Sequence, residues 1–207
     1  MTVKADLRAA MRGRRKQAAD ANPYAAERVV EHVGAMLDAL FAATGDFART
    51  SRECAFTAAL YGAQGSEMEA APLARALMVH GLELALPVVV RRDAPLAFRR
   101  WSPGDPLELD QAGCPAPLDL ASEVTPDLII VPLLAFDAAG GRLGQGGGYY
   151  DRTLEALRTE GSHRRIAAVG LGYAAQELDH LPMDAHDQRL DGVLTEAGYR
   201  TAKRVSE

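Results

Sequence analysis

The chain has 207 residues, of which 48% are hydrophobic and 25% are charged, a balance typical of a soluble globular protein. We expect a single domain over residues 1–207 and no membrane partner, because no apolar run approaches the roughly 20 residues of a membrane span. The formal net charge of −5 argues against a general nucleic-acid-binding protein, since phosphate neutralisation drives such binding. The two cysteines, Cys54 and Cys114, form neither a disulfide framework nor a metal-type pair.

The first predicted element is an amphipathic helix at the N-terminus. Its apolar residues recur at helical spacing, at Val3, Leu7, Ala10 and Met11. Lys4, Arg8 and Arg12 are four residues apart and form a basic stripe beside the apolar one. The segment lacks the apolar core of a secretory signal peptide, which favours a cytoplasmic location.

A second helix is predicted to run to Leu40, with Asn22 as its N-cap and Pro23 at its first helical position. Short apolar segments beyond it predict strands, over 53–61, 82–90, 95–101, 127–136, 165–173 and 191–196. A further helix is expected over 72–81. Residues 102–126 are rich in Pro, Gly and Asp and are expected to be irregular.

The alternation of strands and helices predicts an α/β fold, with a mainly parallel sheet between two layers of helices. Ligands of such sheets bind outside the carboxyl ends of the strands. The glycine-rich stretch GGRLGQGGGYYDR, residues 140–152, directly follows the strongest predicted strand. We therefore expect the functional site at this stretch.

Several features of residues 140–152 indicate a phosphate-binding loop. Gly144, Gly146 and Gly148 let the backbone curl, so that successive N–H groups converge on an anion. A helix expected to begin near Asp151 adds its N-terminal dipole, and Arg142 adds a charged fork. Asp151 would repel phosphate unless a magnesium ion lay between them.

The simpler interpretation is an ordinary turn in which Asp151 caps the following helix. The loop is neither a P-loop nor a dinucleotide fingerprint, because no Gly-Lys-Ser/Thr ends it and Tyr149 stands where the third glycine would fall.

The stretch VPLLAFDAAGGRLGQGGGYYDR, residues 131–152, resembles the signature of the 5-formyltetrahydrofolate cyclo-ligase family, V-P-x-x-A-F-D followed by G-x-R-L-G-x-G-x-G-Y-Y-D-R. Four further stretches of the chain resemble other segments of the family, in the same order. They are KADLRAAMRGRR (4–15), LYGAQGSEMEAAPL (60–73), LPVVVRRDAPLAFRRWSPGDPL (86–107) and HDQRLDGVLTE (186–196). The resemblance spans nearly the whole chain.

Three positions depart from the family pattern. Gln145 stands where many relatives carry an aromatic or basic residue, and Gly147 where some carry a basic one. Ala70 replaces a threonine that is frequent in relatives. The first two changes leave fewer side chains to contact a nucleotide.

The resemblance implies a three-layer α/β/α domain whose Rossmann-like sheet is similar to that of sugar-phosphate isomerases and CoA transferases. It also implies a reaction in which ATP and Mg²⁺ drive the cyclisation of 5-formyltetrahydrofolate to 5,10-methenyltetrahydrofolate, releasing ADP and phosphate. The formyl oxygen attacks the γ-phosphorus, N10 closes on the activated carbon, and phosphate leaves. Such chemistry needs positioning and charge stabilisation and no protein nucleophile. We expect a monomer that takes the folate with or without a polyglutamate tail.

The resemblance assigns roles to individual residues. Arg142 and Tyr150 would be catalytic, and Asp151 and Asp191 would hold Mg²⁺. ATP would be bound by residues of the first helix and the glycine loop, namely Lys4, Arg8, Arg142, Leu143, Gly144, Gln145, Gly146, Gly147, Gly148, Tyr149 and Tyr150. The folate would be bound by Arg8, Gly62, Glu67 and Tyr149.

Each of these residues also has a purely structural interpretation. Lys4 and Arg8 suit a solvated helix face, and Glu67 suits the exposed start of a helix. Either tyrosine could belong to the core, and Asp191 could be a turn residue.

Two other functions stay open from the sequence. A nucleotide-binding regulatory module would bind ATP without folate turnover. An enzyme similar to sugar-phosphate isomerases or CoA transferases would act without ATP, and this option depends on fold analogy alone.

Overall fold

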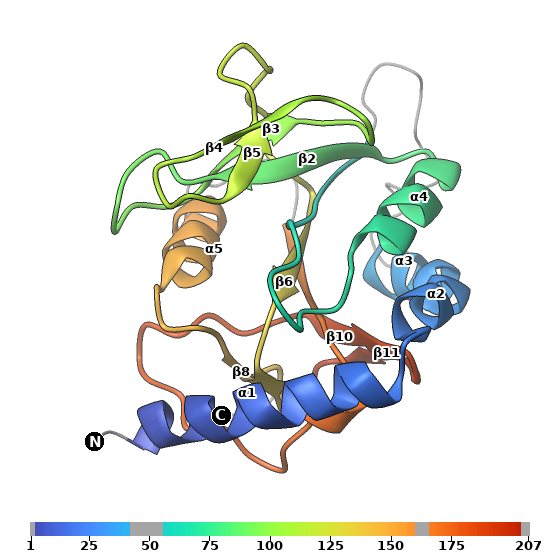
Figure 1. Ribbon diagram of the computed structural model, residues 1–207, viewed down its shortest axis with the longest axis vertical. Coiled ribbons are helices and arrows are strands. Elements are labelled where there is room, and N and C mark those ends of the chain that lie inside the picture. Colours follow the sequence, from blue (N-terminus) through green and yellow to red (C-terminus); the bar gives the residue numbers. More distant parts are fainter. Residues whose placement is uncertain (1–2, 42–55, 160–165, 204–207) are drawn as a thin grey trace.

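The computed structural model describes residues 3–41, 56–159 and 166–203 (Figure 1). Its helical elements are α1 (Val3–Ala21), α2 (Ala25–Val29), η1 (Val30–His32), α3 (Val33–Phe41), α4 (Ala71–Val79), α5 (Tyr149–Thr159) and η3 (Ala174–Gln176). Its strands are β1 (Thr57–Ala59), β2 (Glu83–Val88), β3 (Ala97–Arg100), β4 (Leu107–Leu109), β5 (Pro115–Pro117), β6 (Leu128–Pro132), β7 (Ala135–Phe136), β8 (Arg142–Leu143), β9 (Ala167–Leu171), β10 (Gly192–Thr195) and β11 (Gly198–Thr201).

A seven-stranded sheet forms the centre of the protein, in the order β11-β10-β9-β6-β1-β2-β3. The pairs from β10 through β9, β6 and β1 to β2 are parallel. Among the described strands of this sheet, only the edge strands β3 and β11 pair antiparallel. The predicted α/β fold with a mainly parallel sheet is confirmed.

Helices cover both faces of the sheet, with α5 on one side and α2 to α4 on the other (Figure 1). Alternate residues of a strand point to opposite faces, and the two hydrophobic clusters follow this rule. Ile130 of β6 packs in the cluster with α2, α3 and α4, whereas Ile129 and Val131 pack in the cluster that contains Leu154 of α5. Among the described helices, none is long and apolar enough to cross a membrane.

The N-terminal half departs from the sequence prediction at Asn22. This residue is not an N-cap, because its side-chain amide donates to the carbonyl of Ala18 and so closes the end of α1. The single helix predicted up to Leu40 is divided into α2, η1 and α3. Residues 53–55 of the predicted strand 53–61 lie outside the described residues, and the described part contains β1.

Two predictions in the middle of the chain were only partly right. Residues 102–126 contain the antiparallel pair β4 and β5. The strand predicted over 127–136 ends at Pro132, whose missing N–H cannot continue the ladder. After it, β7 pairs with β8 in a separate hairpin. The glycine loop follows β8 directly and connects this hairpin to α5.

Candidate active site

A cavity of about 440 Å³ opens at the carboxyl ends of the parallel strands. Tyr61 and Gly62 follow β1, Leu133 follows β6, and Val89 follows β2, and all four line the cavity. This is the edge of the sheet at which the sequence placed the site. The helix α1 runs past the same edge (Figure 1) and contributes the side chains of Lys4, Arg8 and Arg15.

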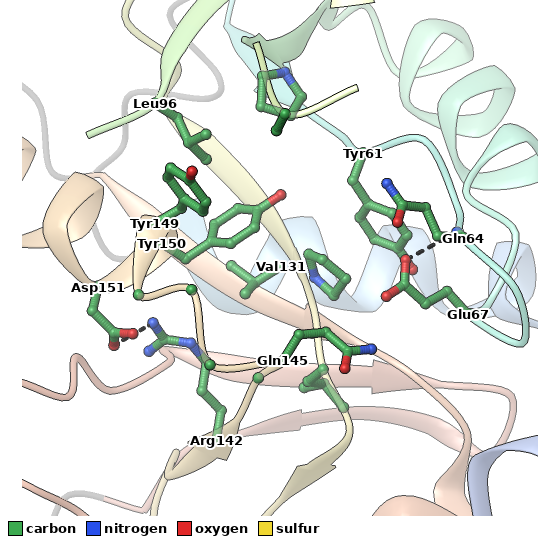
Figure 2. Close-up of a pocket in the computed structure, with 18 of the residues that line it drawn as sticks. Tyr61, Gln64, Glu67, Leu96, Val131, Arg142, Gln145, Tyr149, Tyr150 and Asp151 are labelled. Atoms are coloured by element: carbon green, nitrogen blue, oxygen red, sulfur yellow. Dashed lines mark hydrogen bonds and ion pairs between the residues drawn. The ribbon is translucent and has the colours of Figure 1, made fainter. Parts of the chain in front are cut away.

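All the predicted site residues except Asp191 line this cavity. Residues that the sequence interpretation missed line it as well, including Arg15, Tyr61, Gln64, Asp110, Cys114, Asp184 and Asp187. Figure 2 shows Arg142 and Asp151 on one side of the cavity and Tyr61, Gln64 and Glu67 on the other, with Val131 and the two tyrosines between them.

The turn before the glycine loop is organised by Asp137. Its carboxylate accepts hydrogen bonds from the N–H groups of Ala139, Gly141 and Leu181, at 3.0, 2.8 and 3.0 Å. Gly140 has a φ of +79°, and a Cβ at this position would lie 2.5 Å from the carbonyl oxygen of Leu190. The hydrogen bonds of Asp137 therefore close the turn, and the close approach of Leu190 requires a glycine at position 140.

The carbonyl groups of the glycine loop are held by arginines. Arg8 Nε donates to the carbonyl of Gly144 at 3.0 Å, and Arg152 Nη2 donates to that of Gly147 at 2.8 Å. Within the described part of the chain, none of the N–H groups of residues 144–148 donates a hydrogen bond. These donors lie on the cavity wall beside the first turn of α5, an arrangement suited to an anion.

Arg142 and Asp151 form an ion pair beneath the loop, with 2.5 Å between Nη2 and Oδ1. The Nη1 group of Arg142 donates to the carbonyl of Gln188, whose N–H donates back to Asp151 Oδ1 at 3.0 Å. Burial lowers the pKa of Arg142, and the charge of Asp151 opposes this shift. Because α5 begins at Tyr149, Asp151 lies inside the helix and is not its N-cap.

A second charged group lies at the start of α1. Lys4 Nζ contacts Asp184 Oδ2 at 2.7 Å and Asp187 Oδ2 at 2.5 Å. The N–H of Asp184 also donates to Asp187 Oδ2, at 2.7 Å. Asp187 lies in the HDQRLD segment (186–191), but Asp191, the last acid of this segment, was the one predicted as a magnesium ligand.

Asp191 has a different position and different partners. It directly precedes β10, so it lies toward the amino end of a parallel strand, away from the edge that carries the cavity. Its Oδ2 accepts from the N–H of Ala168 at 2.9 Å and from Arg158 Nη2 at 3.3 Å. Among the described residues there is no group of three or more His, Cys, Asp or Glu arranged to hold a metal ion.

The far side of the cavity presents the carboxylate of Glu67 (Figure 2). Glu67 Oε1 pairs with Arg15 Nη1 at 3.1 Å, and its Oε2 accepts from the N–H of Gln64 at 3.1 Å. Burial raises the pKa of Tyr150 well above its ordinary value of 10.0, and the negative charge of Glu67 adds to this shift. Tyr150 is therefore a neutral hydroxyl donor at physiological pH.

The fold and the site define an α/β protein with a pocket at the carboxyl edge of its sheet, lined by a glycine loop and by basic side chains. The 5-formyltetrahydrofolate cyclo-ligase family model matches residues 1–196, and the chain belongs to this family. A 5-formyltetrahydrofolate cyclo-ligase of Haemophilus influenzae is 33% identical over 141 residues, which cover 66% of this chain and 73% of that protein.

Two solved structures are also similar. The 5,10-methenyltetrahydrofolate synthetase of Aquifex aeolicus has a TM-score of 0.70 and 28% identity, covering 100% of this chain and 96% of its own. That of Mycoplasma pneumoniae has a TM-score of 0.59 and 20% identity, covering 94% and 99%. The second match supports the fold alone.

Proposed function

We propose that this protein uses ATP to cyclise 5-formyltetrahydrofolate to 5,10-methenyltetrahydrofolate, with release of ADP and phosphate. Membership of the cyclo-ligase family supports the reaction. The observation that most directly supports ATP binding is the row of N–H groups at residues 144–148, which make no hydrogen bond within the described residues. A polyphosphate would accept from these groups at the mouth of α5.

The cations around the loop would hold the phosphates from both sides. Arg8 lies against Gly146, where an added Cβ would come within 3.3 Å of the guanidinium carbon. Lys4 lies on the same wall, and Arg142 is fixed under the loop by Asp151. Charges that are already in place stabilise a phosphoryl transfer without reorganising during the reaction.

The formyl group would lie between the two sides of the cavity. Glu67 and Gly62 would bind the pterin, with Tyr149 as a wall. The formyl oxygen attacks the γ-phosphorus, and the bond from that phosphorus to the β–γ bridging oxygen breaks to release ADP. N10 then attacks the activated carbon and loses its proton, and phosphate leaves with the former formyl oxygen. Tyr150 would donate a hydrogen bond to the oxygen on which charge develops.

The carboxylates on the cavity wall suit Mg²⁺, which takes one or two carboxylates together with phosphate oxygens. Asp151 makes its contacts through Oδ1 and Asp187 through Oδ2, and the second oxygen of each has no partner among the described residues. Since Asp191 is engaged away from the cavity, we place the pair at Asp151 and Asp187. Bound there, Mg²⁺ would neutralise phosphate charge.

The test is a spectrophotometric assay for the methenyl product, with and without ATP and Mg²⁺. We expect product only when ATP is present. Nucleotide binding without product would instead favour a regulatory module, and turnover without ATP would favour chemistry similar to that of isomerases or transferases.

We also propose that the chain acts as a cytoplasmic monomer with one domain over residues 1–207. The folate would be accepted with or without a polyglutamate tail. Sedimentation at micromolar concentration checks the monomer, and KM values for the mono- and polyglutamylated substrates check the tail.

A further inference from the structure

Arg15 is a buried cation in the wall of the cavity that the proposed reaction does not use. It lies on α1, four residues after the buried Met11, and only 6% of its surface is exposed. Its Nε donates to Ser66 Oγ at 3.1 Å, and its Nη1 donates to Glu67 Oε1 at 3.1 Å. The guanidinium therefore bonds to two consecutive residues of the turn between β1 and α4.

Glu67 is held from its other side by its own turn. The N–H of Gln64 donates to Glu67 Oε2 at 3.1 Å, and the N–H of Glu67 donates to the carbonyl of Gln64 at 3.1 Å. Each carboxylate oxygen thus has one protein donor, and an ionised oxygen accepts more than one hydrogen bond. The orientation of the carboxylate is therefore fixed, and both of its oxygens can still accept a hydrogen bond from a ligand in the cavity.

We infer that Arg15 is a positioning residue that holds Glu67 oriented to receive the paired N–H donors of the pterin ring. This inference rests on the proposed function. A planar pair of adjacent donors is best recognised by a carboxylate that presents both oxygens, and charge-assisted bonds of this type are strong. Arg15 acts on the folate through Glu67 and contributes nothing to the nucleotide half of the site.

The first experiment compares arginines on the same helix. Arg15→Met should raise the KM for 5-formyltetrahydrofolate by about tenfold, the effect of one strong hydrogen-bonding interaction. The kcat and the KM for ATP should stay within about twofold. Arg15→Lys should recover part of the loss, since it keeps the charge without the fork. Arg14→Met is the matched control, because Arg14 is an exposed neighbour, and it should change nothing.

The second experiment is a double-mutant cycle with Glu67→Gln. If Arg15 acts through Glu67, adding Arg15→Met to Glu67→Gln raises the folate KM little further. If the two substitutions multiply in their effects on the folate KM, the positioning role is overturned. It is also overturned if Arg15→Met raises the KM for ATP as much as the KM for folate. Should Glu67→Gln alone leave the folate KM unchanged, the proposed folate site fails instead.

A milder variant keeps the test decisive if Arg15→Met does not fold, as removal of one partner of a buried pair can cause. Ser66→Ala removes only the hydroxyl that accepts from Arg15 Nε. It should raise the folate KM about twofold to threefold, as expected for one neutral hydrogen bond. Unchanged KM values in both Ser66→Ala and Arg15→Lys contradict the inference.

Discussion

Tyr150 shows how burial determines the chemistry of a single residue in this pocket. Desolvation and the charge of Glu67 both raise the pKa of its hydroxyl above the ordinary 10.0, so the group donates a hydrogen bond and forms no phenolate at working pH. Tyr150→Phe should lower kcat by about a hundredfold, the scale of one positioned donor. The alkaline limb of the kcat profile, measured from pH 6 to 9, should keep its position. A limb that disappears in the variant would assign its titration to Tyr150.

Lys4 and Asp187 make a pH-dependent contribution to stability. Burial opposes the charged form of both groups, but their mutual hydrogen bond and the other contacts outweigh it. As a result, the pKa of Asp187 lies below 3.8 and that of Lys4 above 10.5. The pair therefore stabilises the fold between these limits, and the contribution is lost as pH falls through the lowered value or rises through the raised one.

Lys4→Met should lower the free energy of unfolding at pH 7 by about 1 kcal/mol, the upper range for a partly exposed pair. Denaturant titrations at several pH values give the difference between the variant and the original protein. This difference should shrink below about pH 4. A difference that is constant down to pH 2 would contradict the contribution of Asp187.

The glycine loop shows which positions of an element require glycine. Gly148 has a φ of +65°, where any added side chain is strained, whereas nothing lies within 4 Å of a Cβ at Gly144. Gly148→Ala should lower the free energy of unfolding by about 1 kcal/mol, and Gly144→Ala should change it by less than about 0.5 kcal/mol. Thermal unfolding of both variants measures the contrast, and equal losses would mean that the backbone at 148 is free to change.

The elements that were predicted well are those with a strong local pattern. The segment at 127–136 combines an apolar run with flanking turn residues, and β6 forms there. The hairpin of β4 and β5 was missed because its order comes from Asp110. That carboxylate accepts from the N–H groups of Ala112 and Cys114, and from Val89 on the neighbouring segment, at 2.9 Å each. A single aspartate in a Pro- and Gly-rich sequence gives no periodic signal.

At the scale of the whole molecule, α1 joins parts of the chain that are far apart in sequence. It contacts the glycine loop through Arg8, the segment after η3 through Lys4, and the turn after β1 through Arg15. An opening of α1 would break both halves of the proposed site. Ligands that need the intact site should therefore suppress this opening.

Hydrogen exchange tests this coupling. With ATP alone at 100 times its Kd, amides of α1 should exchange about a hundredfold more slowly than in the free protein. Amides near the centre of β6 serve as the internal reference: if they exchange only through global unfolding, they should slow by the same factor. Unchanged exchange in α1, with slower exchange elsewhere in the cavity wall, would exclude α1 from the binding unit.

The family signature and the glycine spacing are contiguous in the chain, so the glycine loop and the helix after it could be inferred before any coordinates. Backbone freedom and N–H convergence depend on neighbouring residues alone. The partners of the charges could not be inferred in this way. Arg15 and Glu67 are 52 residues apart, and Lys4 and Asp187 are 183 apart.

The choice between Asp187 and Asp191 illustrates the same difference. Both acids lie in one short segment, and residue type does not separate them. Folding turns Asp187 toward the cavity and Lys4, and leaves Asp191 at the amino end of β10. Charge interactions act through space and fall with distance, so the packing of the sheet and α1 decides which charged residues become partners. The conformation of the glycine loop, in contrast, is determined by the residues that follow one another in its sequence.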